Sequence, residues 1–241
     1  MKTSRAVAIL HAPGDVAGTL PELLAEQGID LELLQVTDPL PAPETLDLLL
    51  VLGSPESAYD QSLPWLAAEL AWLKRVQGYG VPTLGICFGS QILARALGGQ
   101  AVRNRQAEIG WTPLQCLVRD EWQHPGPWLN FHFDTFRLPA TASLLAETDL
   151  APQAFRQGRA LGVQFHPEIT VSMFDTWTNY WRSSPQGQQF LATAGDLPER
   201  MRAEIGLRAA DNKDNCRRLL ADFLERFYLV LLNGLTLFIN I

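Results

Sequence analysis

The sequence predicts an α/β protein with a doubly wound, mainly parallel sheet, followed by a helical extension. Three observations lead to this prediction. Short apolar runs of strand length alternate with longer amphipathic segments through the first hundred residues. The runs are apolar at nearly every position, which is typical of strands covered on both faces. The segments between them repeat apolar residues at helical spacing.

The expected elements of the first half follow one another in the order strand, helix, strand. The runs expected as strands are Ala6–Leu10, Leu31–Val36, Leu48–Leu52 and Val81–Ile86. The patterns expected as helices are Leu20–Gln27, Trp65–Val76 and Ser90–Leu97. Gly98 and Gly99 close the last of these helices. In such sheets, reactive side chains lie at the carboxyl ends of the strands.

The middle of the chain has a different character, and helices return after it. Shorter strands are expected at Ala101–Val102, Thr112–Val118 and Ser143–Leu145, joined by loops rich in proline and tryptophan, and a further strand at Leu161–Phe165. From Thr170 onward the chain is expected to be mostly helical. We therefore expect a catalytic domain at residues 1–185 and a helical extension at 186–241, packed on the same domain.

The last segment, Tyr228–Ile241, carries no charged residue. It is shorter than the roughly 20 residues that cross a bilayer. Packing in the core or in a homo-oligomer is the expected role, with attachment to a membrane surface as the alternative.

Composition narrows the range of functions. The 241 residues carry a net charge of −7 and no basic run, which excludes nucleic acid as an expected partner. The three cysteines, Cys87, Cys116 and Cys216, form no CxxC pair, so neither a disulfide framework nor a zinc site is expected. This cysteine usage fits the cytoplasm. We expect no metal and no cofactor.

Cys87 lies in Gly85-Ile86-Cys87-Phe88-Gly89-Ser90-Gln91, where an apolar strand ends and a helical pattern begins. A sharp turn from strand to helix lifts the side chain at its apex clear of the sheet. The N-terminus of the helix favours a thiolate there. The backbone N–H of Phe88 would point toward a developing oxyanion. Taken alone, the residue could also be a small buried cysteine.

His166 ends another apolar strand, in Gly162-Val163-Gln164-Phe165-His166-Pro167-Glu168. Residues two apart in an extended segment project to the same side, and Pro167 stiffens the link between them. Glu168 could thus orient one imidazole nitrogen while the other faces Cys87. A surface His-Pro-Glu turn is the alternative interpretation of this segment alone.

These motifs resemble those of a known family. The segments GICFGSQ and GVQFHPE look like the nucleophile and His/Glu motifs of class I glutamine amidotransferase domains, and Gly53-Ser54-Pro55 resembles that family's oxyanion loop. The resemblance runs over roughly residues 5 to 170. Glu108–Trp111 and His132–Phe136 look like segments of the stand-alone members that are similar to the glutaminase part of GMP synthase.

The resemblance implies a flavodoxin-like fold and a role for each matching residue. Cys87, His166 and Glu168 would form the catalytic triad, and the backbone N–H groups of Ser54 and Phe88 would hold the oxyanion. The residues expected to contact the substrate are Gly53, Glu56, Gln91, His132, Phe133 and Asp134. Ser54 and Phe133 stand where many members have glycine, which alters the walls of the expected pocket.

The expected function is cysteine-dependent hydrolysis of the γ-amide of glutamine or of a γ-glutamyl compound. One alternative is a glutaminase subunit that passes ammonia to a separate synthetase chain, because no P-loop-like motif follows residue 170. An alternative of another class is a non-catalytic binding or regulatory protein on the same fold. His11 follows the first strand and could line the same edge of the sheet, although a loop histidine is the favoured expectation.

Overall fold

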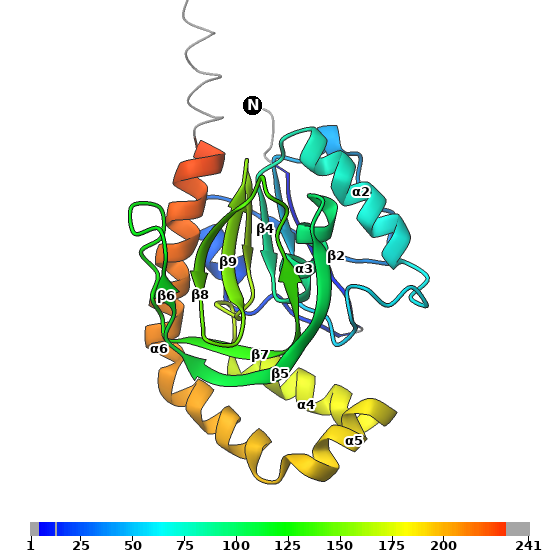
Figure 1. Cartoon of the computed structure of the whole chain (residues 1–241), viewed down its shortest axis with the longest axis vertical. Coiled ribbons are helices and arrows are strands. Elements are labelled where there is room, and N and C mark those ends of the chain that lie inside the picture. Colours follow the sequence, from blue (N-terminus) through cyan, green and yellow to red (C-terminus); the bar gives the residue numbers. More distant parts are fainter. Residues whose placement is uncertain (1–4, 13, 230–241) are drawn as a thin grey trace, which may run out of the picture.

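The computed structural model describes residues 5–12 and 14–229 (Figure 1). Of the uncharged segment Tyr228–Ile241, residues 230–241 lie outside the described part of the chain. The strands are β1 (Ala6–Leu10), β2 (Leu31–Gln35), β3 (Leu48–Val51), β4 (Thr83–Ile86), β5 (Gln100–Thr112), β6 (Gln115–Cys116), β7 (Trp128–Arg137), β8 (Ser143–Glu147), β9 (Pro152–Gln157) and β10 (Ala160–Val163). The helices are α1 (Leu20–Ala25), α2 (Leu66–Gly78), α3 (Phe88–Ala96), α4 (Val171–Ser183), α5 (Pro185–Ala194) and α6 (Leu197–Leu224), with short η1 (Pro43–Thr45) and η2 (Glu225–Leu229).

The main sheet is mixed and has the strand order β2-β1-β3-β4-β10-β9-β8-β6. Strands β2, β1, β3, β4 and β10 run parallel, whereas β9, β8 and β6 add to the β10 side as antiparallel strands. Strands β5 and β7 form a separate antiparallel ribbon that crosses one end of the sheet (Figure 1). The predicted α/β class with a mainly parallel sheet is therefore confirmed.

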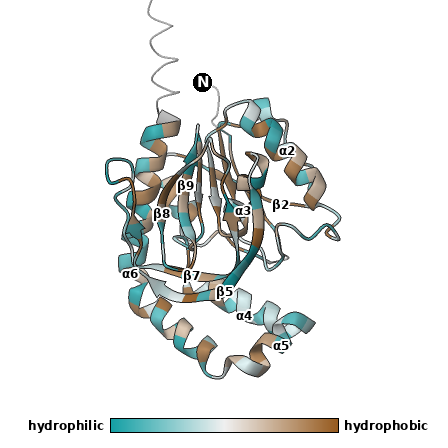
Figure 2. Ribbon diagram, in the orientation of Figure 1, coloured by the Kyte–Doolittle hydropathy of each residue, from teal (hydrophilic) through white to brown (hydrophobic). Residues whose placement is uncertain are grey.

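Helices cover both faces of the sheet. One apolar cluster joins β1, β3 and β4 to α1 and α6, and a second joins the other face of β1 and β3 to α2 and α3. Alternate residues of β1 serve the two clusters, Ala8 the first and Ile9 the second, because successive side chains of a strand point to opposite faces. Figure 2 accordingly shows apolar strands in the centre and mixed colouring on the helices.

The seven elements expected in the first half are confirmed, with bounds shifted by a few residues. The mainly helical character after Thr170 is confirmed as well. Helix α6 packs on the same sheet through Cys216, Leu219 and Phe223, although the division at residue 185 stays a prediction.

The strands predicted in the middle of the chain differ from those of the structure. The strand expected at Ala101–Val102 is the start of the longer β5, and that expected at Thr112–Val118 is reduced to the two residues of β6. A loop was expected where β7 lies, and β9 was not expected. The β5–β7 ribbon lies outside the main sheet, so its strands do not carry the apolar run of a strand buried on both faces.

Candidate active site

Cys87 lies in a tight turn between a strand and a helix at the edge of the sheet. Strand β4 ends at Ile86 and α3 begins at Phe88, so a single residue separates strand from helix. Cys87 has φ 52° and ψ −111°, and it is the one non-glycine residue with positive φ among those described. Such backbone strain persists only where the surroundings enforce it. The turn holds the thiol at the edge of the sheet.

A glycine makes the turn possible. A Cβ built on Gly89 would lie 1.8 Å from the carbonyl oxygen of Val51, which belongs to the neighbouring strand β3. The first turn of α3 therefore packs directly on the end of β3. Because Phe88 is the first residue of α3, its N–H has no intrahelical acceptor. This donor points from the helix end that carries Cys87.

His166 lies on the next strand end, three residues after β10, which pairs with β4. Its Nδ1 is 2.9 Å from Oε1 of Glu168, and both side chains are almost wholly buried. The sulfur of Cys87 interacts with the same imidazole. The structure thus brings the three residues expected as a triad into one connected series.

The charge state of His166 follows from this environment. Burial acts to lower its pKa, but the charges of Glu168 and Cys87 and the hydrogen bonds to both outweigh it and raise the pKa of His166 to about 10. The imidazole is therefore protonated at neutral pH. A cation between a carboxylate and a sulfur is the arrangement that stabilises a thiolate.

Gln164 was not singled out from the sequence, although it lies within the motif around His166. Its buried side chain donates Nε2–H to Sγ of Cys87 at 3.7 Å. Its Oε1 accepts from Nε2 of Gln91 at 3.3 Å, and the same nitrogen donates to the carbonyl oxygen of Asp134 at 3.2 Å. Gln164 and Gln91 together thus link Cys87 to the β7 side of the site.

The expected oxyanion loop follows β3. A Cβ on Gly53 would lie 3.2 Å from Cε1 of His166 and 3.9 Å from Cβ of Cys87, so the loop backbone faces the thiol closely. Nδ1 of His11 lies 3.2 Å from the carbonyl oxygen of Gly53, and Nε2 lies 2.9 Å from Oε1 of Glu69. Both side chains of this pair are fully buried.

His11 lies in the loop after β1, as expected, but it is buried and borders the same edge of the sheet as Cys87. It lies directly after β1 and packs against Trp65 and Phe88 with ring centroids 5.4 and 4.6 Å away. Its partner Glu69 is 58 residues away in the sequence. No local sequence pattern indicates such a pair. The position of His11 after an apolar strand indicates only that it lies at the carboxyl edge of the sheet.

A cavity of about 630 Å³ opens beside Cys87. All residues expected at the site line it except Glu168, which lies behind His166. Those that line it are Gly53, Ser54, Glu56, Cys87, Phe88, Gln91, His132, Phe133, Asp134 and His166. The volume lies within the range of about 300–1,000 Å³ that is typical of small-molecule sites.

The β7 side of the cavity is fixed by a polar network. The Asp134 carboxylate accepts from Ser57 at 2.5 Å, from Tyr59 at 3.0 Å and from Arg103 at 3.3 Å. Nε2 of His132 lies 3.2 Å from Oε2 of Glu108, a carboxylate on the paired strand β5. Nδ1 of His132 also lies 2.9 Å from the carbonyl oxygen of Asp134, so the two residues are linked on this wall.

Two acidic side chains lie on the opposite side, toward α4. Burial raises the pKa of Asp15 to about 6, although the Ala12 amide, His11 and His166 act to lower it. Burial also raises the pKa of Tyr180, together with the nearby carboxylate of Glu56, to which the phenol is hydrogen-bonded. Asp15 therefore adds negative charge to this side of the cavity as the pH rises through about 6.

Helix α6 reaches the backbone of the site from outside the sheet. Nδ2 of Asn212 donates to the carbonyl oxygen of Pro167 at 2.9 Å, and the whole side chain is buried. The N–H of Thr19 donates to the carbonyl oxygen of Glu168 at 3.0 Å. The segment that carries His166 and Glu168 is therefore held by α6 on one side and by the start of α1 on the other.

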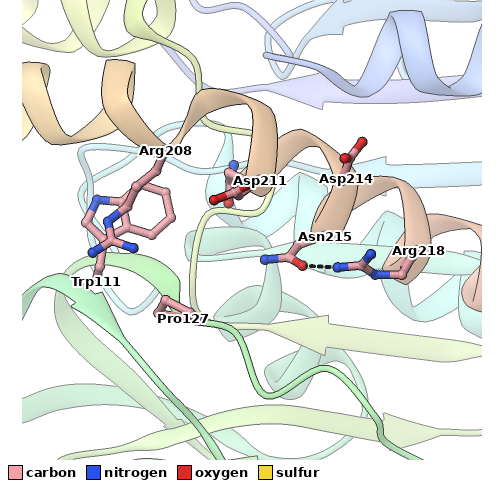
Figure 3. A pocket seen from close by; sticks show the side chains of 8 residues that line it. Trp111, Pro127, Arg208, Asp211, Asp214, Asn215 and Arg218 are labelled. Atoms are coloured by element: carbon pink, nitrogen blue, oxygen red, sulfur yellow. Dashed lines mark hydrogen bonds between the residues drawn. The ribbon is translucent and has the colours of Figure 1, made fainter.

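A second, smaller hollow of about 300 Å³ lies between α6 and Trp111 of β5 (Figure 3). The guanidinium of Arg208 lies 5.3 Å from the centre of the Trp111 ring, and Asn215 is hydrogen-bonded to Arg218. None of its lining residues lines the larger cavity. Within residues 5–12 and 14–229, no helix is long and apolar enough to cross a membrane, and no cluster of potential metal ligands occurs.

The fold agrees with the family comparison. The family model described as "Glutamine amidotransferase class-I" matches residues 15–178, which is more than half of the chain. The protein belongs to the class I glutamine amidotransferase family.

Its curated relatives include GMP synthases. The chain is 31% identical over 133 residues to "GMP synthase [glutamine-hydrolyzing]" of Gloeothece citriformis, covering 52% of this chain and 23% of that one. It is 27% identical over 218 residues to the same enzyme of Aeropyrum pernix, covering 84% and 41%. The chain thus spans less than half the length of these relatives.

Solved structures resemble it over nearly the whole chain. A glutamine amidotransferase of Thermotoga maritima has a TM-score of 0.80 at 25% identity, covering 94% of this chain and 98% of that one. A glutamine amidotransferase of Methylobacillus flagellatus has a TM-score of 0.77 at 22% identity, covering 92% and 94%. These solved structures cover a larger share of the chain than the family model does.

Proposed function

We propose that this protein is a cysteine-dependent hydrolase that cleaves the γ-amide of glutamine or of a γ-glutamyl compound. The observation that carries the proposal is the series Cys87, His166 and Glu168 at the edge of a cavity of small-molecule size. Membership of the class I glutamine amidotransferase family supports it, since the GMP synthases among its relatives are named as hydrolysing glutamine.

The acylation step uses the charges at the thiol. Sγ of Cys87 attacks the γ-carbonyl carbon, and the carbonyl oxygen becomes an oxyanion. The imidazolium of His166 gives its proton to the amide nitrogen, the C–N bond breaks, and ammonia or an amine leaves with a glutamyl thioester behind it. Glu168 keeps the imidazole oriented and stabilises its positive charge.

Deacylation reverses the proton movement. His166, now neutral, takes a proton from water, and the hydroxide attacks the thioester carbon. The C–S bond breaks, and glutamate leaves with Cys87 again a thiolate beside an imidazolium. During both steps the oxyanion would accept from the N–H groups of Ser54 and Phe88. Each such donor contributes about 3 kcal/mol to lowering the barrier.

The test is a hydrolysis assay on glutamine and on a panel of γ-glutamyl amides, measuring released glutamate. We expect Cys87→Ser to lower kcat at least about 10⁴-fold. Cys116→Ser is the matched control, because Cys116 lies on β6 at the far edge of the main sheet. This control should retain the activity of the wild type.

Two results would contradict the proposal. Undiminished hydrolysis by Cys87→Ser would show that another group is the nucleophile. No hydrolysis of any amide by the folded wild-type protein would favour a non-catalytic binding or regulatory role on the same fold.

A second candidate follows from the relatives. The matched part of the Gloeothece citriformis GMP synthase is 23% of that chain, so this protein resembles one portion of a larger enzyme. As a glutaminase subunit, it would pass ammonia to a separate synthetase chain. Glutamine hydrolysis that rises strongly only when a synthetase from the same cell is added would favour this candidate over a stand-alone hydrolase.

A further inference from the structure

The cavity beside Cys87 has an aromatic wall that the release of ammonia does not require. Six side chains from β7, α4 and α5 form this aromatic wall, and all are half-buried. They are Phe131, Phe133, Trp177, Tyr180, Trp181 and Phe190. Ammonia is small and polar, and it gains nothing from apolar contact. A wall of this kind is typical of a site that binds a ring or another large apolar group.

The aromatic wall begins at the imidazole. The ring of Trp177 meets that of His166 edge-on, with centroids 4.7 Å apart. Phe131 stacks on Trp181 at 5.1 Å, and Phe190 lies 5.2 Å from Trp181. In the proposed mechanism His166 protonates the leaving nitrogen. Whatever that nitrogen carries therefore lies next to α4, against the aromatic wall.

The charges around this space select among such groups. Asp15 and Glu56 both line the cavity on the α4 side, and Glu56 is hydrogen-bonded to Tyr180 of the wall. The one arginine in the cavity lining, Arg103, already pairs with Asp134 at 3.3 Å. A leaving group with its own carboxylate, such as an amino acid, would meet two carboxylates and no uncompensated cation.

We propose that the preferred substrate is a γ-glutamyl amide whose amine portion carries an aromatic ring and no carboxylate. The inference rests on the proposed function and adds the identity of the leaving group. The reaction consumes one water, which supplies the hydroxyl group of glutamate. The amine leaves with the proton that His166 delivers.

The test compares three substrates that share the γ-glutamyl group. Glutamine releases ammonia, γ-glutamyl-2-phenylethylamide releases an aromatic amine, and γ-glutamylphenylalanine releases the same skeleton with a carboxylate. We expect kcat/KM for the phenylethylamide to exceed that for glutamine and that for γ-glutamylphenylalanine by at least about tenfold each. The comparison of the phenylethylamide with γ-glutamylphenylalanine isolates the effect of the carboxylate on kcat/KM.

Variants separate the contributions of the wall and the charges. Trp181→Ala should reduce the preference for the phenylethylamide over glutamine about tenfold, and Phe190→Leu should reduce it less. The double change Asp15→Asn and Glu56→Gln should raise kcat/KM for γ-glutamylphenylalanine relative to the phenylethylamide. Tyr79→Ala, at an exposed aromatic residue outside the cavity, is the matched control. It should leave kcat/KM for the phenylethylamide unchanged relative to glutamine and relative to γ-glutamylphenylalanine.

The possible outcomes distinguish this inference from the proposed function. Hydrolysis of glutamine without preference for the phenylethylamide would overturn the inference and leave the proposed function standing. Equal or better hydrolysis of γ-glutamylphenylalanine would overturn it as well, because the carboxylates would then not select. Hydrolysis of none of the three by the folded protein would overturn the proposed function itself.

Discussion

Nε2 of His11 lies 2.9 Å from Oε1 of Glu69, and neither side chain exposes any surface. The other ring nitrogen of His11 holds the carbonyl oxygen of Gly53 at 3.2 Å. The pair therefore connects the interior of α2 with the loop that faces Cys87. Two polar groups this deeply buried stabilise a protein only while both are present.

We expect His11→Ala to lower the free energy of unfolding by about 3 kcal/mol, because it leaves the Glu69 carboxylate buried without its partner. For a chain of this size, the change corresponds to a fall in Tm of roughly 10 °C. Thermal unfolding followed by circular dichroism would measure it.

The double variant His11→Leu with Glu69→Met separates stability from positioning. Apolar replacement of both partners is often close to neutral for stability. If the pair positions the loop at Gly53, kcat should stay low in this double variant even where Tm recovers. Recovery of both quantities would assign the pair a purely structural role.

Gly89→Ala should prevent the turn at Cys87 from closing. The added Cβ would lie 1.8 Å from the Val51 carbonyl oxygen. Because the nearest atoms are all backbone atoms, no flexible side chain can move away to relieve the clash. We expect a loss of at least about 3 kcal/mol in stability, or no folded protein. Urea unfolding would measure the loss.

Gly78→Ala is the matched control for that change. Gly78 is the last residue of α2, and nothing lies within 4 Å of a Cβ built on it. Alanine there should be neutral or should stabilise the protein by up to about 1 kcal/mol. Similar losses in the two variants would contradict the close approach of α3 to β3.

Asp15→Asn should stabilise the protein in a pH-dependent way. The pKa of Asp15 rises from 3.8 to about 6 on folding, so its contribution to stability is fully present below pH 3.8 and is lost as the pH rises through 6. Asparagine removes that loss. The variant should match the wild type near pH 4 and exceed it by about 1–3 kcal/mol at pH 8.

The measurement is the free energy of unfolding of both proteins at pH 4, 6 and 8. Asp60→Asn serves as the control for an exposed aspartate, whose pKa is lowered by hydrogen bonds from Ser62. An advantage of Asp15→Asn that is constant over this pH range would show that burial of the charge is not its cause.

Asn212→Ala should weaken the support of the segment that carries His166 and Glu168. The Pro167 carbonyl oxygen would lose its buried donor, which costs about 1–3 kcal/mol of stability. We expect kcat to fall several-fold with KM little changed, because the imidazole is oriented less well. Steady-state kinetics and Tm would both be measured.

Asn215→Ala makes the same chemical change one turn along α6, at a residue that bonds only to Arg218 among the described contacts. Its kinetics should match those of the wild type. An equal fall of kcat in the two variants would indicate a general effect on α6 and not a specific one at Pro167.

The sequence was sufficient for the parts of the fold that depend on local pattern. Strands such as Leu48–Val51 are buried on both faces, so they appear as continuous apolar runs. Strand β7 does not appear as a continuous apolar run, because Asn130, His132 and Asp134 interrupt its apolar residues. Its partner β5 is also a polar strand of the ribbon. A strand whose polar residues belong to a site does not show the pattern of a core strand.

The same distinction holds for the candidate site. Cys87 and His166 could be placed at the sheet edge because each follows an apolar run, Cys87 directly after β4 and His166 three residues after β10. Glu69 and Asn212 lie within helices, 58 and 45 residues from their partners. Their roles depend on tertiary contacts that no short segment encodes, as does the aromatic wall.

The bond from Asn212 to Pro167 also bears on how the protein matures during translation. The thiol and the imidazole leave the ribosome before the helix that supports them, since Asn212 follows Pro167 by 45 residues. At a synthesis rate of about 5–20 residues per second, the delay is roughly 2 to 9 s. A nascent chain therefore carries Cys87 for seconds before the backbone between His166 and Glu168 gains the support of α6, and the candidate site is completed late in synthesis.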